Sequence, residues 1–136
     1  MKIVITNINK LTLDLANFLS NESEKYEIIL LSEKTKHSNN NLQKMIKIYD
    51  VKNDLIASIL NLDLDNKDII ICNFDNNYDN NIVAQNILNK NQNIKIYILV
   101  SDDSLLDLYN NNDHITVINV NNVINNLLMK TISQEQ

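Results

Sequence analysis

Six short runs rich in isoleucine, leucine and valine recur along the chain, and they constrain its fold more than any other feature. Each run spans four to seven residues, too few for a stable helix, and its apolar residues are consecutive rather than alternating. Strands that are apolar on both faces are typical of parallel sheets, because helices cover such sheets on both sides. The sequence therefore predicts six buried strands, at residues 2–5, 27–31, 45–49, 68–72, 94–100 and 115–120.

Stretches with the spacing of amphipathic helices separate these runs. Their apolar residues recur at intervals of three and four, as in Leu11, Leu15, Phe18 and Leu19. Polar residues that favour helix starts, such as Asp79, precede several of them. We expect helices around residues 11–19, 55–60, 82–88, 105–109 and 123–128, and an irregular or weakly helical segment at 34–41.

This alternation predicts a single domain, residues 1–136, of the α/β class. Strands and helices in regular succession give a Rossmann-like, doubly wound, three-layer sandwich. In that fold a mostly parallel six-stranded sheet lies between two layers of helices, and its crossovers are right-handed.

The composition excludes several classes of protein. The chain has a net charge of −5 and contains no Arg, which makes it a poor electrostatic match to DNA or RNA. No apolar run approaches the ~18 residues that a membrane span needs. A single cysteine, Cys72, forms no internal disulfide. We therefore expect a cytoplasmic protein that binds no nucleic acid and does not insert into a membrane.

In an open parallel sheet ligands bind at the carboxyl ends of the strands, so the segment after the first predicted strand is the first candidate site. There Asn7, Asn9 and Thr12 hold the places of the three glycines of the G-x-G-x-x-G dinucleotide motif, with Ile8 and Lys10 among them. Asn adopts the left-handed conformation more readily than most non-glycine residues, which favours the turn. The branched Thr12 is expected to push the helix away from the first strand. The loop either keeps weak anion binding at a helix N-terminus or only connects strand and helix.

Polar residues also come directly after the later predicted strands. Ser32 stands where an acidic residue would bind ribose hydroxyls, and Glu33 comes one place late. Asp50 is a better placed carboxylate, although capping of the next helix explains it without a ligand. Asn73 comes after the fourth strand and Ser101 after the fifth, and these positions complete the candidate crevice.

The sequence shows no catalytic or metal-binding pattern. Cys72 lies inside a predicted buried strand, and His37 and His114 belong to different loops. A nucleophile elbow needs glycines, and the chain has none. We therefore predict no catalytic or metal-ligating residue and do not expect an enzyme.

The order of these segments resembles the RCK domain, also called KTN or TrkA-N, the nucleotide-binding regulatory domain of potassium channels and transporters. MKIVI, NINKLTLDLANFLS and YEIILLSEK are similar to the start of that domain, and YDVKNDLIASILNLDLDNKDIII is similar to its G-D-A-T-D segment with the next helix and strand. NNIVAQNILNK is similar to the helix that begins with N-L-L-A. IKIYILVSDDSLLDLY and HITVINVNNVINNLL are similar to the last strands and helices of the family. The likeness spans nearly the whole chain, in order.

The resemblance implies binding of NAD(H) or ATP/ADP, a homo-oligomer or pairing with related RCK domains, and a membrane potassium channel or transporter subunit as partner at the inner face of the plasma membrane. The chain departs from the family at the nucleotide-facing positions. All three glycines are replaced, Ser32 takes the place of the ribose acid and Leu99 that of a basic residue, and only Asp50 keeps the expected carboxylate. We therefore expect a regulatory module whose nucleotide site is degenerate, with binding weak or lost. The smaller ligand-binding domain that often accompanies this domain in the family is expected to be missing or to lie on another polypeptide.

Two other interpretations stay open. A pseudo-receiver of the response-regulator type has a similar length, and five strands in the order 2-1-3-4-5 would favour it. A small NAD(P)-binding oxidoreductase needs a glycine turn and a Tyr-x-x-x-Lys pair, and the sequence contains neither.

Overall fold

The computed structural model describes residues 1–22, 24–32, 46–51, 55–109 and 112–134. Six strands form one sheet in the order β3-β2-β1-β4-β5-β6, and every neighbouring pair is parallel. The strands lie within a residue or two of the predicted runs: β1 (Lys2–Thr6), β2 (Glu27–Ser32), β3 (Ile46–Asp50), β4 (Ile69–Cys72), β5 (Lys95–Val100) and β6 (Ile115–Asn119).

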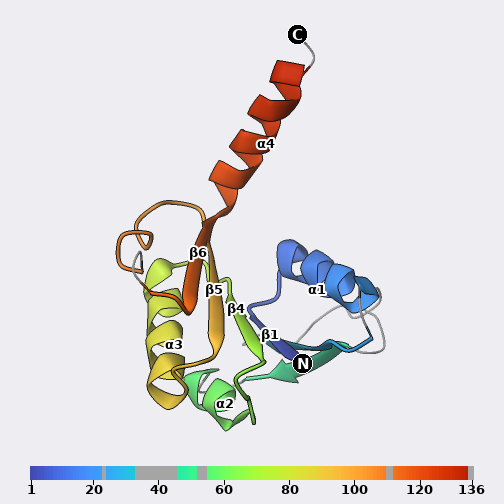
Figure 1. Ribbon diagram of the computed structural model, residues 1–136. Coiled ribbons are helices and arrows are strands. Elements are labelled where there is room, and N and C mark those ends of the chain that lie inside the picture. Colours follow the sequence, from blue (N-terminus) through green and yellow to red (C-terminus); the bar gives the residue numbers. More distant parts are fainter. Residues whose placement is uncertain (23, 33–45, 52–54, 110–111, 135–136) are drawn as a thin grey trace.

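The sheet has a layer of helix on each face, as the sequence predicts. Figure 1 shows α1 (Lys10–Glu22) on one side and α2 (Leu55–Asn61) with α3 (Asn77–Lys90) on the other. The strand order reverses beside β1, because β2 and β3 extend to one side of it and β4 to β6 to the other. This order differs from the five-stranded 2-1-3-4-5 arrangement on which the receiver interpretation depends.

Each face of the sheet has its own hydrophobic core, because successive side chains of a strand point to opposite faces. On the α1 face, Ile3 and Ile5 of β1 pack with Ile28, Leu30 and the helix residue Ala16. The larger core lies on the α2 and α3 face and takes its strand residues from β1, β2, β4, β5 and β6. Residues from the two-sided runs therefore fill both cores, which is the physical reason for the runs themselves.

The segment between β5 and β6 corrects one prediction. The expected helix around residues 105–109 is absent, and residues 101–109 form bends and turns instead. Leu105 and Tyr109 are buried in the larger core, where they fix the turn segment to the sheet. Their spacing of four residues therefore resembled that of a helix although no helix is present. The Asp102 carboxylate accepts the Ser104 N–H at 2.9 Å, and such local side-chain bonds compete with helix formation.

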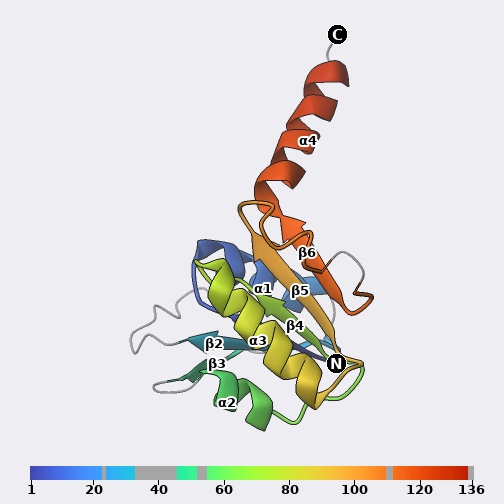
Figure 2. The same cartoon turned by 90° about the vertical axis from the view of Figure 1, so that its left-hand side faces the viewer.

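The last helix, α4 (Val120–Gln134), leaves the sheet. Both views show it extending past the carboxyl end of β6, away from the other helices (Figure 1, Figure 2). None of its residues is buried. Within the described residues, no helix has the length and apolarity needed to cross a membrane.

Candidate functional site

The loop between β1 and α1 is built around Asn7, which adopts the left-handed conformation with φ of 68°. This confirms the expectation that Asn replaces glycine at the turn. The Asn7 N–H donates to the Leu31 carbonyl at 3.0 Å, and its Nδ2 donates to the Asn73 carbonyl at 3.0 Å. One residue therefore connects the carboxyl ends of β1, β2 and β4.

Asn73 is tied to the same loop by a second bond. Its N–H donates to the Thr6 Oγ1 at 3.1 Å, and the Thr6 side chain is fully buried between the strand ends. The next turn is held by Asn80, also fully buried, whose Oδ1 accepts the Phe74 N–H at 2.9 Å. Asn7 and Asn73, predicted from separate segments, are thus brought into contact.

Asn9 and Thr12 form a reciprocal cap at the start of α1. The Thr12 N–H donates to Asn9 Oδ1 at 3.0 Å, and the Asn9 N–H donates to Thr12 Oγ1 at 2.9 Å. Thr12 and Ala16, one turn apart, are both fully buried. The Thr12 hydroxyl thus turns back onto the backbone as part of the cap, and the pair packs inward, whereas the expected displacement of the helix from the first strand stays a prediction.

The other predicted site residues lie apart from this contact. Ile8 packs against the α1-side core, and the exposed Lys10 pairs with Asp14 one turn along the helix at 3.1 Å. Ser32 is buried at the end of β2 and lies in register with Asp50 of β3. Glu33 and the segment 34–41 lie outside the described residues.

A pocket of about 270 Å³ opens at the carboxyl edge of the sheet. Asn73 and Ser101, both predicted to lie in the crevice, line it. The remaining lining residues come from the ends of β4 and β5 and from the first turns of three helices: Leu11, Phe74, Asp75, Asn77, Leu99, Val100, Val120 and Asn121.

Three helices meet this pocket with their N-termini, and each begins on an asparagine cap. The Oδ1 atoms of Asn9, Asn76 and Asn119 each accept the N–H three residues further on, at 3.0, 2.8 and 3.3 Å. A helix start has unpaired N–H groups, and a cap of this kind takes the third of them. The N–H groups at the first and second positions have no partner within the helix, and Leu11, Asn77, Val120 and Asn121, which line the pocket, stand at these positions.

Leu11 and Asn77 could have been found in the sequence by their place rather than by their chemistry. Each stands one or two residues after an asparagine that lies between a predicted strand and a predicted helix. Val120 and Asn121 gave no such signal, because the sixth predicted strand runs to residue 120. Side-chain type gives no such signal, because two of the four residues, Leu11 and Val120, are apolar.

Two carboxylates, Asp102 and Asp103, lie in the turn segment that follows β5, and both accept hydrogen bonds there. The Ser104 hydroxyl, 2.6 Å from Asp102 Oδ1, lowers the pKa of Asp102 below its usual value, with further help from the Ser104 N–H and from Asn77 Nδ2 at 3.0 Å. Asp103 accepts the Asn119 Nδ2 at 2.7 Å, which links this turn to the start of α4. The edge thus combines three positive helix ends with charged carboxylates, a combination that suits a ligand with both an anionic group and hydroxyl donors.

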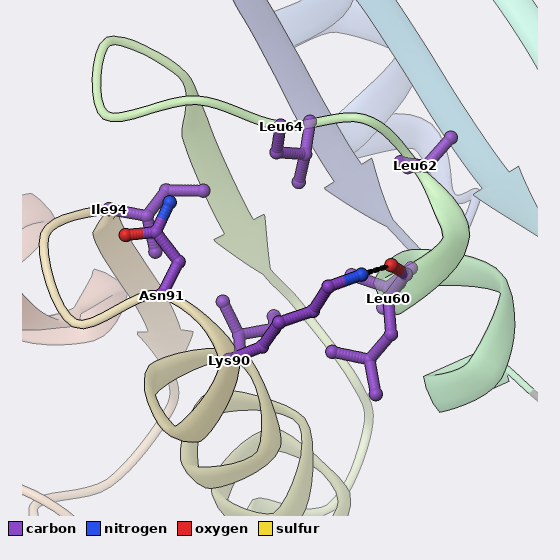
Figure 3. Close-up of a pocket in the computed structure, with 8 residues that line it drawn as sticks. Leu60, Leu62, Leu64, Lys90, Asn91 and Ile94 are labelled. Carbon is purple, nitrogen blue, oxygen red and sulfur yellow. Dashed lines mark hydrogen bonds between the residues drawn. The ribbon is translucent and has the colours of Figure 1, made fainter.

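A second pocket, of about 150 Å³, lies at the opposite edge, where the strands begin. Figure 3 shows leucine and isoleucine side chains around it and the Lys90 ammonium group donating to the Leu60 carbonyl. Its one cationic side chain is already paired with the backbone. This pocket therefore lacks the convergent polar groups of a ligand site.

The described residues contain no group of three His, Cys, Asp or Glu side chains placed to hold a metal ion. Cys72 is buried in β4, and burial raises the pKa of its thiol to about 12. The thiol is therefore protonated at neutral pH and is a poor nucleophile.

Comparison with known proteins gives a structural relative. No protein-family model matches the sequence, and no curated protein matches it either. The fold is similar to that of the Kef CTD of Shewanella denitrificans in its AMP-bound form, with a TM-score of 0.62 and 14% sequence identity. The alignment covers 98% of this chain and 81% of that one. At this identity the likeness establishes a shared Rossmann-like α/β fold, of the kind that the RCK resemblance implies.

Proposed function

We propose that the chain is a regulatory module of potassium transport that binds an adenine mononucleotide at the carboxyl edge of its sheet. The observation that carries the proposal is the convergence of three asparagine-capped helix starts on one pocket. The N–H groups without a helical partner and the positive end of a helix N-terminus are a general device for binding phosphate. The similar Kef CTD structure holds AMP, which supports the same class of ligand for this pocket.

The size and the loop favour a mononucleotide over NAD(H). The pocket of about 270 Å³ lies just under the roughly 300–1,000 Å³ usual for small-molecule sites. In a dinucleotide site, glycines let the pyrophosphate approach the backbone of the first loop. Here the side chains of Asn9 and Thr12 occupy that turn, and each accepts a hydrogen bond from the backbone N–H of the other residue. We therefore propose weak binding of AMP, ADP or ATP, with loss of the dinucleotide site.

The RCK resemblance supports a regulatory role without catalysis. The same resemblance supports a membrane potassium channel or transporter subunit as partner and a cytoplasmic location at the membrane surface. A homo-oligomer or pairing with related RCK domains stays a prediction at this level. No observation favours the receiver or oxidoreductase alternatives.

Thermal unfolding in the presence of ligands tests the proposal. AMP, ADP, ATP, NAD⁺, NADH and inorganic phosphate are compared at equal concentrations. A ligand at 100 times its Kd raises the free energy of unfolding by about 2.7 kcal/mol, so even a weak site gives a measurable rise in Tm at millimolar concentration. We expect a rise with adenine mononucleotides and a smaller one with NAD(H). A preference for NAD(H), or no rise with any nucleotide, would refute the proposed ligand.

A matched pair of variants locates the site. Leu11 lines the pocket and is 45% exposed, whereas Phe18 lies two turns further along α1 and is 60% exposed. Leu11→Asp puts a carboxylate beside the expected phosphate, and we expect nucleotide affinity to fall by about tenfold or more. Phe18→Asp makes the same charge change away from the pocket and should leave affinity unchanged. Equal effects of the two variants would place the nucleotide elsewhere.

A further inference from the structure

The second pocket, at the edge of the sheet where the strands begin, is lined almost entirely by hydrocarbon. Six of the eight described residues that line it are leucine or isoleucine, and two of these, Ile59 and Ile94, are fully buried. A buried water molecule needs several polar partners, so water fills such a space poorly. The lack of converging polar groups therefore disfavours a polar ligand here but suits an apolar one.

Hydrogen bonds outside the pocket hold its roof in place. The roof is the loop of residues 62–67, which contributes two leucines to the lining. The Lys2 Nζ donates to the Asp63 carbonyl at 2.7 Å and so ties this loop to β1. The buried Asp68 carboxylate fixes the end of the loop, because it accepts the Lys2 N–H at 2.7 Å and the Asp65 N–H at 2.9 Å. These bonds keep the loop from closing the space beneath it.

Lys90 determines which charges the pocket accepts. It is the last residue of α3, and Figure 3 shows its side chain reaching across to the end of α2, where the ammonium group donates to the Leu60 carbonyl. This ammonium group repels a cationic ligand and occupies the carbonyl that such a ligand would use. An anion gains little, because α2 and α3 both end at the pocket and a helix C-terminus carries partial negative charge. The site therefore favours an uncharged ligand.

The volume of the pocket limits the ligand to about one ring. The space measures about 150 Å³. An apolar cavity of roughly 150 Å³ in an engineered protein stays dry and binds benzene. Apolar atoms around an empty space lack partner atoms on one side, so an occupant of matching size restores their dispersion contacts.

We propose that this pocket is a second ligand site, which binds one compact uncharged molecule of about the size of a benzene ring between α2 and α3. The ligand is held by its shape and by dispersion contacts with the leucine and isoleucine side chains, and Lys90 excludes cations. The site shares no lining residue with the pocket at the carboxyl edge, so it stands independently of the nucleotide proposal.

Three probes with the same ring and different charges test the site: benzene, benzoate and benzylammonium. Thermal unfolding of the full chain and the NMR signals of the Ile59 and Ile94 methyl groups follow binding. We expect benzene to raise Tm and to shift these methyl signals in a saturable way, and the two charged probes to bind about tenfold more weakly or worse. No saturable effect of benzene, or equal affinity for benzoate, would overturn the proposal.

A matched pair of variants locates the probe. Leu64 lines the pocket, and Leu64→Phe fills part of the space, so we expect benzene affinity to fall by about tenfold or more. Leu108→Phe makes the same change at a position that is 58% exposed and does not line this pocket, and it should leave the affinity unchanged. Circular dichroism checks that both variants fold. Equal effects of the two substitutions would place benzene elsewhere and overturn the site.

Lys90→Met tests the charge selection separately. Methionine keeps an unbranched apolar stem, but the change removes the ammonium group and frees the Leu60 carbonyl. We expect benzylammonium to bind about tenfold more tightly than it does to the unmodified chain, and benzene affinity to change by less than about threefold. Continued exclusion of benzylammonium would show that Lys90 does not set the selectivity and would overturn its assigned role.

Discussion

At the scale of single residues, asparagine takes the role that glycine has in other chains of this fold. Asn7 adopts the left-handed conformation and also donates its side-chain amide to the Asn73 carbonyl, a bond that glycine has no atoms to make. Asn80 closes the turn after β4 with Oδ1 on the Phe74 N–H. A chain with 27 asparagines and no glycine therefore forms turns that are tied to their surroundings by side chains.

Substitution at Asn7 separates these two contributions. Asn7→Ala removes the bond to Asn73 and puts a less tolerant residue at a φ of 68°, so we expect a loss of about 2 kcal/mol in the free energy of unfolding. Asn7→Gly loses the bond but relieves the backbone, and its loss should be under about 1 kcal/mol. Urea titration measures both. Equal losses in the two variants would mean that the left-handed conformation contributes nothing.

At the scale of elements, the cap decides where a helix begins. The bonded pair of Asn9 and Thr12 fixes the start of α1, and Asn76 fixes the start of α3 by accepting the Asp79 N–H at 2.8 Å. Between β5 and β6 the local bonds of Asp102 to Ser104 hold a turn, and the expected helix does not form there. The same kind of polar residue therefore starts a helix or replaces one, depending on the residues that come after it.

The cap of α1 is tested by two changes at Thr12. Thr12→Val keeps the shape of the side chain but removes the oxygen that accepts the Asn9 N–H, and we expect a loss of about 1–2 kcal/mol. Thr12→Ser keeps the oxygen and should cost less. Chemical denaturation of the two variants gives the comparison, and a valine variant as stable as the serine variant would contradict the cap.

The edge strand β3 and its neighbour β2 are joined by an ion pair with a predictable pH dependence. Lys47 Nζ of β3 lies 2.9 Å from Glu27 Oε1 of β2, and this hydrogen bond lowers the pKa of Glu27 below 4.5 and raises that of Lys47 above 10.5. A carboxylate with a lowered pKa in the folded state stabilises the fold above its unfolded pKa, and the contribution disappears as the pH falls through the folded pKa.

We therefore expect the free energy of unfolding to decrease with acid below about pH 4.5, and Glu27→Gln to make this decrease shallower. The effect is small because both side chains are largely exposed. Glu22→Gln makes the same change of charge at the end of α1 and serves as control. Denaturation at several pH values measures the slope, and identical slopes for Glu27→Gln and the unmodified chain would refute the contribution.

At the scale of the whole molecule, one sheet separates two cores. Ile5 of β1 lies in the core beneath α1, and Ile98 of β5 lies in the core beneath α3. One strand, β4, stands between β1 and β5, so these side chains are about 10 Å apart across the sheet and point to opposite faces. The two layers are therefore stabilised by separate packing but held in one framework.

Alanine at both positions tests this arrangement. Ile5 and Ile98 are fully buried, and each single substitution should cost about 2–5 kcal/mol because it leaves a cavity. The double variant should show the sum of the two losses to within about 0.5 kcal/mol, because the sites share no packing partner. Calorimetry or urea unfolding gives the values. A double loss far from the sum would mean that the cores interact through the sheet.

The strands were predictable because a strand that is buried on both faces has consecutive apolar residues. This pattern is visible in the strand's own sequence, without knowledge of the segments that pack against it. The positive φ of Asn7 was predictable in the same way, from a local preference of the residue. The role of Thr12 was not, because its hydroxyl acts only in relation to Asn9 in the capped turn. Nor were Val120 and Asn121 as pocket residues, because they reach the site from the far end of the chain.

Sequence alone thus determined the strands and the parallel α/β class, since these depend on local periodicity and on general rules of chain connection. The same rules predicted the edge of the sheet at which the candidate pocket lies. The tertiary structure decided the rest. It placed three helix starts around one pocket, made residues 101–109 a turn segment anchored by the buried Leu105 and Tyr109, and directed α4 away from its own sheet. The physical reason is that an apolar periodicity shows that a face must be covered, but only the packed structure shows what covers it and which face is left for another molecule.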